Sequence, residues 1–271
     1  MNEGNGIAVD AAAVQGSLNR TSGTDGSDAA EASMGFVPVL RRNAAVAVDT
    51  GSGMVDITGV RPPMLSIAYG VGKFAGTFAP GQLILGDNDL IADKDTPLSV
   101  IVLKYNQYVK EAITQDGYAM GLRARLFPTK EAAKAAGLRI EWGPNSEKPE
   151  ADFALDMLLL IEQPEKLESA MFGQSFGGKQ YALAFASFDK TAYKSISNTY
   201  LQSVVYAMRG KKTWGGVWEL KTRLQVSKKN TANKSWVPTF TLKGFLPEAM
   251  TAEIELLYGS FLTAAMAPNA G

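Results

Sequence analysis

The stretch from Arg209 to Lys243 concentrates two kinds of side chain, cations that bind phosphate groups and aromatic rings that stack on nucleobases. It holds nine Lys and Arg residues against the single acid Glu219, a net charge of +8. Single-stranded nucleic acid is bound by cations that follow its phosphates and by flat rings on which its unpaired bases stack. Stacking contributes about 1–3 kcal/mol per base and tolerates every base, so such a surface would bind without sequence preference.

We expect the rings of this stretch to stack on bases and its cations to contact phosphates, and a shorter group of basic and aromatic residues occurs earlier in the chain. Trp214, Trp218 and Tyr105 are the first candidates for stacking. Each Trp has an alternative interpretation, since a tryptophan in a strand usually packs into the core. The candidate nucleic-acid-binding residues are Lys73, Phe74, Lys104, Tyr105, Lys211, Lys212, Trp214, Trp218, Lys221, Arg223, Lys228, Lys229, Lys234 and Trp236.

The sequence contains no cysteine and no histidine. This composition excludes disulfides, thiolate or imidazole metal sites, and Ser-His-Asp or Cys-His catalysis. Any catalysis would have to use carboxylate, lysine or tyrosine side chains. We therefore expect a protein that is not an enzyme and that requires neither a metal nor a cofactor.

Two short motifs suggest other chemistry. The run Gly70-Val-Gly72-Lys73-Phe-Ala75-Gly76 fits a loose dinucleotide fingerprint, but the residues after it lead into a predicted strand at Gln82 instead of opening a helix. We interpret it as a turn between strands. The carboxylates of residues 87–95 could hold Mg²⁺ in a nuclease, but the segment lacks the glycine and the closing glutamate of an EF-hand loop, which favours a solvated loop.

Charge is distributed unevenly along a chain that is neutral overall, with 27 basic and 27 acidic residues. Residues 1–33 carry a net charge of −4, and residues 137–171 carry −5. Small and polar residues dominate 1–35, so we expect a flexible acidic tail there, a single folded domain over 36–260, and a flexible C-terminus over 261–271. One hypothesis is that the tail covers the surface formed by the basic stretch 209–243 when DNA is absent, and that DNA binding releases it to replication or recombination proteins.

No run approaches the roughly eighteen uninterrupted apolar residues of a membrane span. The segment Met1–Gly6 also lacks the basic region and apolar stretch of a secretory signal. We expect a cytoplasmic protein without a membrane partner, in the host cytoplasm if the chain is viral.

The elements that must position these side chains are mostly strands. Segments rich in Val, Ile and Leu, separated by Gly, Pro and Asp-Asn turns, predict strands over 44–48, 54–60, 64–69, 82–85 and 98–105. Helices are predicted from the N-cap Thr129 to the stop at Gly137, over 189–208, and over 247–257.

Alternating apolar and polar residues over 213–226, a polar turn, and a second strand from Trp236 predict a long β-hairpin with a basic tip. Interspersed strands and few helices indicate an α+β fold. We expect an antiparallel sheet or an OB-like barrel at its core.

The order of segments resembles a family of tailed-bacteriophage single-stranded-DNA-binding or replication-associated proteins. The likeness rests on spaced apolar and aromatic positions over most of residues 60–243, with no catalytic signature. Some family members have cysteines that suggest a metal knuckle, whereas this chain has none, so no metal is implied. The segments that carry the resemblance are Pro63–Ile67, Pro80–Leu85, Val100–Leu103, Lys104–Glu111, Leu158–Ile161, the Lys190–Met208 helix, Trp218–Leu224 and Trp236–Pro238.

This resemblance implies a homo-oligomeric protein that coats single-stranded DNA in phage-type replication or recombination. The acidic segment of this chain lies at the N-terminus, whereas many single-strand binders end in an acidic C-terminal tail. The alternative is a non-enzymatic structural or self-assembling protein, such as a virion or shell component, in which the hairpin acts as an arm between subunits.

Overall fold

The computed structural model describes residues 47–49, 54–56, 62–145, 147–227 and 231–264. Its main sheet has seven strands in the order β12-β11-β6-β8-β10-β9, with β7 pairing to β6, and every pairing is antiparallel. The strands of this sheet are β6 (Leu98–Glu111), β7 (Leu126–Phe127), β8 (Ala151–Glu162), β9 (Gln174–Phe176), β10 (Lys179–Asp189), β11 (Gly216–Val226) and β12 (Lys234–Phe245).

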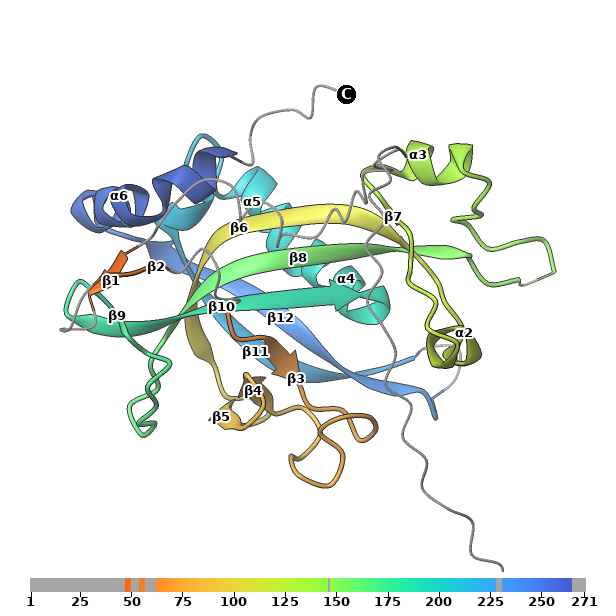
Figure 1. Cartoon of the computed structure of the whole chain (residues 1–271), viewed down its shortest axis with the longest axis horizontal. Coiled ribbons are helices and arrows are strands. Elements are labelled where there is room, and N and C mark those ends of the chain that lie inside the picture. Colours follow the sequence, from red (N-terminus) through yellow and green to blue (C-terminus); the bar gives the residue numbers. More distant parts are fainter. Residues whose placement is uncertain (1–46, 50–53, 57–61, 146, 228–230, 265–271) are drawn as a thin grey trace, which may run out of the picture. The chain divides into compact units, whose positions relative to one another are not determined.

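The central strand β8 is apolar almost throughout because both faces of the sheet are covered. Successive side chains of a strand point to opposite faces. Met157 and Leu159 accordingly pack into one core, and Leu158 and Leu160 pack into another. In Figure 1, β6, β8 and β10 run side by side across the centre of the view, with α6 (Glu248–Ala264) near one end of them.

Two different sets of elements cover these faces. The first core includes residues of the small sheet, such as Leu83, and of the helical segment after β10, such as Ile196 and Tyr200. The second core includes Ile254 and Tyr258 of α6. The main sheet is thus the middle layer of an α+β fold.

The small sheet has three antiparallel strands in the order β3-β4-β5, and a two-stranded pair precedes it. A single parallel bridge joins Met64 to Phe185 of β10, next to a hydrogen bond from the Phe185 amide to the Pro63 carbonyl. The described strands therefore confirm an antiparallel core, but the sheet stays open and is not closed into a barrel. These shorter strands are β1 (Ala47–Asp49), β2 (Met54–Asp56), β3 (Leu65–Ile67), β4 (Leu83–Leu85) and β5 (Asp89–Ala92).

The predicted helices are present, with shifted ends. Thr129 caps the helix α3 and accepts a hydrogen bond from the Ala132 amide at 3.1 Å. The helix predicted over 189–208 is one continuous segment with a π-helical middle, and α6 continues to Ala264, beyond the predicted end at 257. The helical segments are α2 (Gln115–Ala119), α3 (Lys130–Ala135), α4 (Lys190–Ile196), η2 (Ser197–Leu201), α5 (Gln202–Tyr206), η3 (Thr213–Gly215) and α6. None of the described helices combines the length and the apolar character that a membrane span requires.

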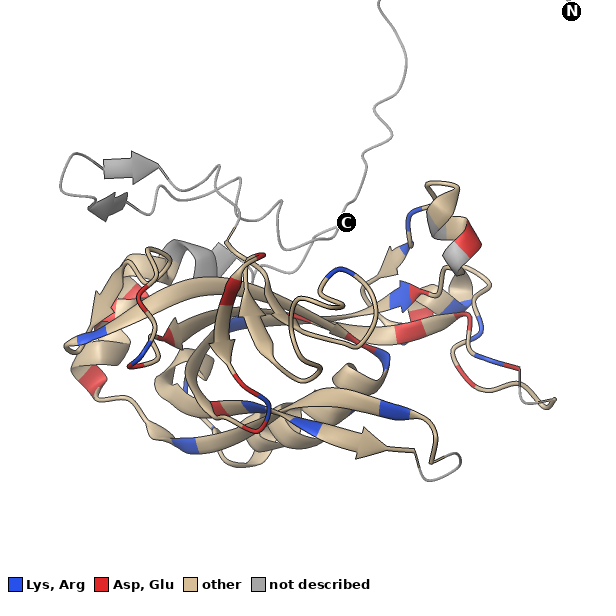
Figure 2. Cartoon of the chain, turned by 90° about the horizontal axis from the view of Figure 1, so that it is seen from below, with Lys and Arg blue, Asp and Glu red and all other residues tan. Residues whose placement is uncertain are grey.

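The predicted hairpin is confirmed. β11 pairs with β12 from Gly216↔Phe245 to Val226↔Lys234. The residues between Leu220 and Leu242 include no acid, and Figure 2 shows basic positions and no acidic ones along the outer part of this hairpin.

The prediction of a solvated loop over residues 87–95 is only partly correct. Asp89–Ala92 forms the strand β5, in which Ile91 is buried. Its carboxylates serve separate partners. Asp87 pairs with Lys73, Asp89 accepts a hydrogen bond from the Ser169 hydroxyl, and Asp93 accepts one from Gln82 Nε2 at 2.7 Å. Within the described ranges, no group of three or more carboxylates is placed to hold a metal ion.

Candidate nucleic-acid interface

Three adjoining hollows, which together we call the groove, lie between the small sheet, the β10–α4 junction and the outer end of the hairpin. The loop hollow, of about 390 Å³, lies between residues 64–74 and the end of β10, and the central hollow, of about 290 Å³, lies between Tyr69, residues 187–192 and Trp236. The tip hollow, of about 780 Å³, lies between α4 and the end of the hairpin. The central hollow shares Tyr69 with the loop hollow and Ser235 with the tip hollow, so the three hollows adjoin in series.

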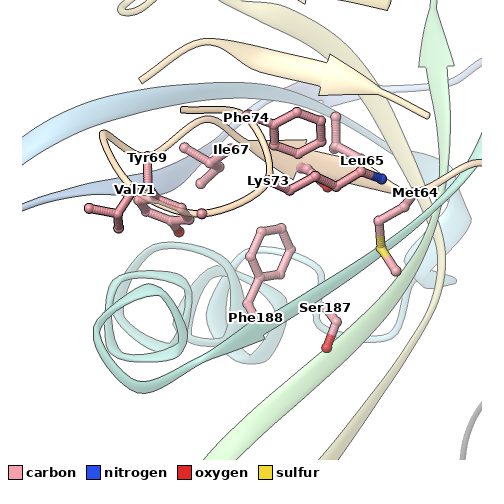
Figure 3. Close-up of a pocket in the computed structure, with 11 residues that line it drawn as sticks. Met64, Leu65, Ile67, Tyr69, Val71, Lys73, Phe74, Ser187 and Phe188 are labelled. Carbon is pink, nitrogen blue, oxygen red and sulfur yellow. The ribbon is translucent and has the colours of Figure 1, made fainter. Parts of the chain in front are cut away.

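Aromatic rings line two of these hollows. Tyr69 is 41% exposed, and Phe74 and Trp236 are half-buried. Figure 3 shows Tyr69 and Phe74 on the loop side of the hollow, with Phe188 projecting toward them from β10. Accessible ring faces at successive positions are what stacking on unpaired bases requires.

Trp236 is held in place by contact with Gly81, two residues before β4. Gly81 has φ +95°, and a Cβ built there would lie 2.6 Å from Cδ2 and Cε3 of the Trp236 ring. The Thr222 hydroxyl donates a hydrogen bond to the Gly81 carbonyl from the neighbouring strand β11. Only a residue without a side chain fits between the backbone and this indole.

Cations occur in each part of the groove. Lys73 lines the loop hollow, Lys190 the central hollow, and Lys194 and Lys234 the tip hollow. Lys190 has φ +50°, which is uncommon for a residue other than glycine, at the point where β10 turns directly into α4. Among the described lining residues, Asp189 is the acidic exception, and its carboxylate lies 3.6 Å from Lys110 Nζ.

A buried carboxylate lies beneath the groove. Asp156 of β8 is 4% exposed and accepts a hydrogen bond from the Tyr108 hydroxyl at 3.1 Å. Burial raises the pKa of Asp156, while hydrogen bonds from Ser187 and Tyr108 and the charge of Lys110 act in the opposite direction. Ser187 also lines the loop and central hollows, so it connects this carboxylate to the groove.

The stacking roles predicted for Trp214 and Trp218 are wrong. Trp218 has no exposed surface and packs against Tyr200, with the ring centroids 4.7 Å apart. Trp214 is 7% exposed and packs in the core that includes α6 residues. Neither indole can reach a base, because each lies within a hydrophobic core.

Lys211 and Lys212 lie at the opposite end of the hairpin from its tip. Lys212 pairs with Glu255 of α6, and Lys211 Nζ lies 3.4 Å from the centroid of the Phe245 ring. β11 has 11 residues, which at about 3.4 Å per residue separates these lysines from the tip by roughly 35 Å. The basic stretch of the sequence is therefore divided between two ends of the hairpin.

The remaining candidates that the structure describes lie outside the lining of the groove. Tyr105 is half-buried, with its ring edge-on to Tyr200 at 5.6 Å, and burial lowers the pKa of the neighbouring Lys104. Lys221 pairs with Glu219 at 3.4 Å, and Arg223 is exposed on the hairpin. Lys228 and Lys229 lie outside the described residues. Of the predicted set, the groove brings together Lys73, Phe74, Lys234 and Trp236.

Sequence reasoning missed several lining residues, above all Tyr69, Phe188, Lys190 and Lys194. Tyr69 has a signal in the sequence, because it comes directly before the glycine-rich turn at Gly70. The other three occupy a strand end and a helix, and nothing in their local pattern separates them from residues of an ordinary amphipathic element.

Comparison with known proteins finds no match to this chain among protein-family models, curated proteins or solved structures.

Proposed function

We propose that this chain binds single-stranded DNA without sequence preference, in phage-type replication or recombination, and that the strand lies in the groove. The observation that supports the proposal is the succession of three adjoining hollows, whose linings include partly exposed aromatic rings and lysines. Aromatic rings combined with a basic channel are the usual means of binding single strands.

The kind of side chain in the groove favours single strands over duplex. The bases of a duplex are already stacked on one another and paired, so Tyr69, Phe74 and Trp236 could stack only on bases that are unpaired. Stacking on a ring face does not distinguish one base from another, which accounts for binding without sequence preference.

Charge also favours this groove over the rest of the surface. The chain as a whole has a formal charge of zero, whereas the described lining residues comprise four lysines and the single acid Asp189. Contacts between these lysines and phosphates would release counterions, so affinity must fall as salt rises.

The test is a fluorescence anisotropy titration of the full chain with labelled oligo-dT at several salt concentrations. The double variant Lys194→Ala/Lys234→Ala removes two charges from the tip hollow, and Lys211→Ala/Lys212→Ala removes two from the far end of the hairpin as a matched control. We expect the first variant to reduce the slope of log K against log salt by about 1.4, since a single-strand phosphate contact contributes about 0.7. The control should leave the slope unchanged. Equal effects of the two variants, or no binding of oligo-dT, would refute the proposal.

A second candidate function is self-assembly, for which exposed apolar side chains on α5 and α6 are the candidate contacts. Val205, Tyr206 and Leu256 are 63%, 80% and 85% exposed on α5 and α6. Association through such residues should strengthen in sulfate, whereas binding in the groove should weaken as salt rises. Sedimentation velocity in sulfate, with and without Tyr206→Ser, measures this contribution separately from DNA binding.

A further inference from the structure

The loop hollow differs from the rest of the groove in its apolar character. Its volume is about 390 Å³, within the range of about 300–1,000 Å³ that is typical of pockets for small organic groups. Figure 3 shows the side chains of the 64–74 segment on one side and those of β10 on the other. The lining residues that matter here are Tyr69, Val71, Lys73, Phe74, Ser187 and Phe188.

Large apolar side chains are exposed around this hollow. Val71 is 78% exposed, Met64 is 42% exposed and Tyr69 is 41% exposed. Exposed apolar residues scattered singly need no explanation, but a group of them around one concave site indicates a binding surface. An apolar, flat group entering the hollow would remove these side chains from water.

The charged group of this hollow complements such a ligand. Lys73 Nζ lies 5.3 Å from the centroid of the Phe74 ring and pairs with Asp87, and both side chains of this ion pair are largely exposed. A phosphate outside the hollow would therefore approach Lys73 from solvent and would have to displace or share its partner Asp87, while the aromatic rings form the walls of the hollow. A nucleobase attached to a backbone phosphate has this combination of a flat apolar part and an external negative charge.

We propose that the loop hollow takes one unstacked base of the bound strand, with its ring against Phe74 and Tyr69 and its phosphate near Lys73. This inference rests on the proposed function, because the strand reaches the hollow by following the groove. The loop hollow and the central hollow share Tyr69, Ser187 and Phe188, so a backbone that passes Trp236 is led directly to its entrance.

Phe78 provides a matched control for Phe74. The two rings lie in the same turn with centroids 5.8 Å apart, edge to face, but Phe78 does not line the hollow. Truncating either ring removes a similar amount of apolar surface from this turn, and only one of the two truncations removes a wall of the proposed base site.

The experiment compares two probes with equal numbers of phosphates, oligo-dT and an abasic oligonucleotide of the same length. We expect Phe74→Ala to weaken binding of oligo-dT by about 5- to 150-fold, the equivalent of one stacking contact. Its affinity for the abasic probe and its salt dependence should stay as in the unsubstituted chain. Phe78→Ala should leave the affinities for both probes unchanged, and Phe74→Tyr, which keeps the ring, should retain binding of oligo-dT.

A second readout begins with the unsubstituted chain, and its only variant keeps the aromatic ring. Oligo-dT carrying one 2-aminopurine should change its fluorescence on binding to the unsubstituted chain, and Phe74→Tyr should preserve that change. If the unsubstituted chain binds oligo-dT but Phe74→Ala and Phe78→Ala have equal affinities, the base site is refuted while the proposed function stands. Equal affinities of Phe74→Ala and Phe78→Ala for oligo-dT are also the result expected if the hollow binds a side chain of a partner protein instead of a base. If the unsubstituted chain binds neither probe, both proposals fail.

Discussion

Replacing Gly81 with alanine tests whether Trp236 is held in the groove by a contact that leaves no room for a side chain. The backbone of Gly81 has φ +95°, and its missing Cβ would lie 2.6 Å from two atoms of the indole. Two separate costs follow from these facts, one from the backbone conformation and one from the collision with the ring.

The two costs can be separated with a second glycine. Gly137 has φ +85°, and a Cβ there would meet nothing within 4 Å. Gly137→Ala should therefore lower the free energy of unfolding by about 1–2 kcal/mol, the cost of placing an L-residue in the left-handed region. Gly81→Ala should lower it by about 2–5 kcal/mol, because overpacking adds about 1–3 kcal/mol.

The assay is urea unfolding followed by far-ultraviolet circular dichroism, with oligo-dT binding measured on the same samples. We expect Gly81→Ala to weaken binding as well, since relief of the collision moves Trp236 out of its position in the central hollow. Gly137→Ala should bind as the unsubstituted chain does. If the two variants lose equal stability and bind equally, the packing of Trp236 on Gly81 does not exist as described.

Three further predictions address the core, the buried carboxylate and the N-terminus. Trp218→Ala should lower the free energy of unfolding by about 3–5 kcal/mol, because it removes a fully buried ring; a loss below about 1 kcal/mol in urea would mean that the ring is not core. Burial raises the pKa of Asp156 above its ordinary value of 3.8. The folded state therefore binds the carboxyl proton more tightly than the unfolded state does, and the protein loses stability as pH rises above 3.8 and this proton is released. Asp156→Asn cannot ionise, so its unfolding free energy relative to the unsubstituted chain should rise as pH is raised above 3.8, the ordinary pKa of the aspartate, whereas a difference that stays constant with pH would contradict the assignment. Deleting residues 1–33, which carry a net charge of −4, should tighten oligo-dT binding at low salt, and unchanged affinity would show that this segment does not compete for the groove.

Local patterns in the sequence predicted the hairpin and the capped helix. Alternation over 213–226 followed by a polar turn is sufficient for β11 and β12, and Thr129 with Gly137 bounds α3. These features depend on neighbours within a few residues, which is why a single sequence reveals them.

The burial of Trp218 could also have been predicted from the sequence. Side chains alternate between the faces of a strand, so Trp218 shares a face with Leu220 while Glu219 and Lys221 lie on the other. The Trp218 ring and the cations Lys221 and Arg223 of β11 therefore point to opposite faces, and clustering along the sequence did not imply a shared surface. Alternation along a strand assigns neighbouring residues to opposite faces, even where the local composition suggests that they act together.

The groove itself could not be predicted from the sequence. Tyr69, Lys190 and Trp236 come from three distant segments that meet only through the packing of the small sheet, α4 and the hairpin. The sequence also could not predict that the main sheet stays open. The choice between a barrel and an open sheet depends on whether the edge strands β12 and β9 pair with each other. No local pattern encodes that long-range contact.

The most direct test of the groove as the binding surface is ultraviolet cross-linking of the full chain to oligo-dT, with the attached peptides located by mass spectrometry. We predict cross-links at Tyr69, Phe74 and Trp236, which line the connected loop and central hollows, and their loss as salt rises. Cross-links confined to the far end of the hairpin near Lys211 and Lys212, or to the exposed Trp142, would contradict this assignment of the binding surface.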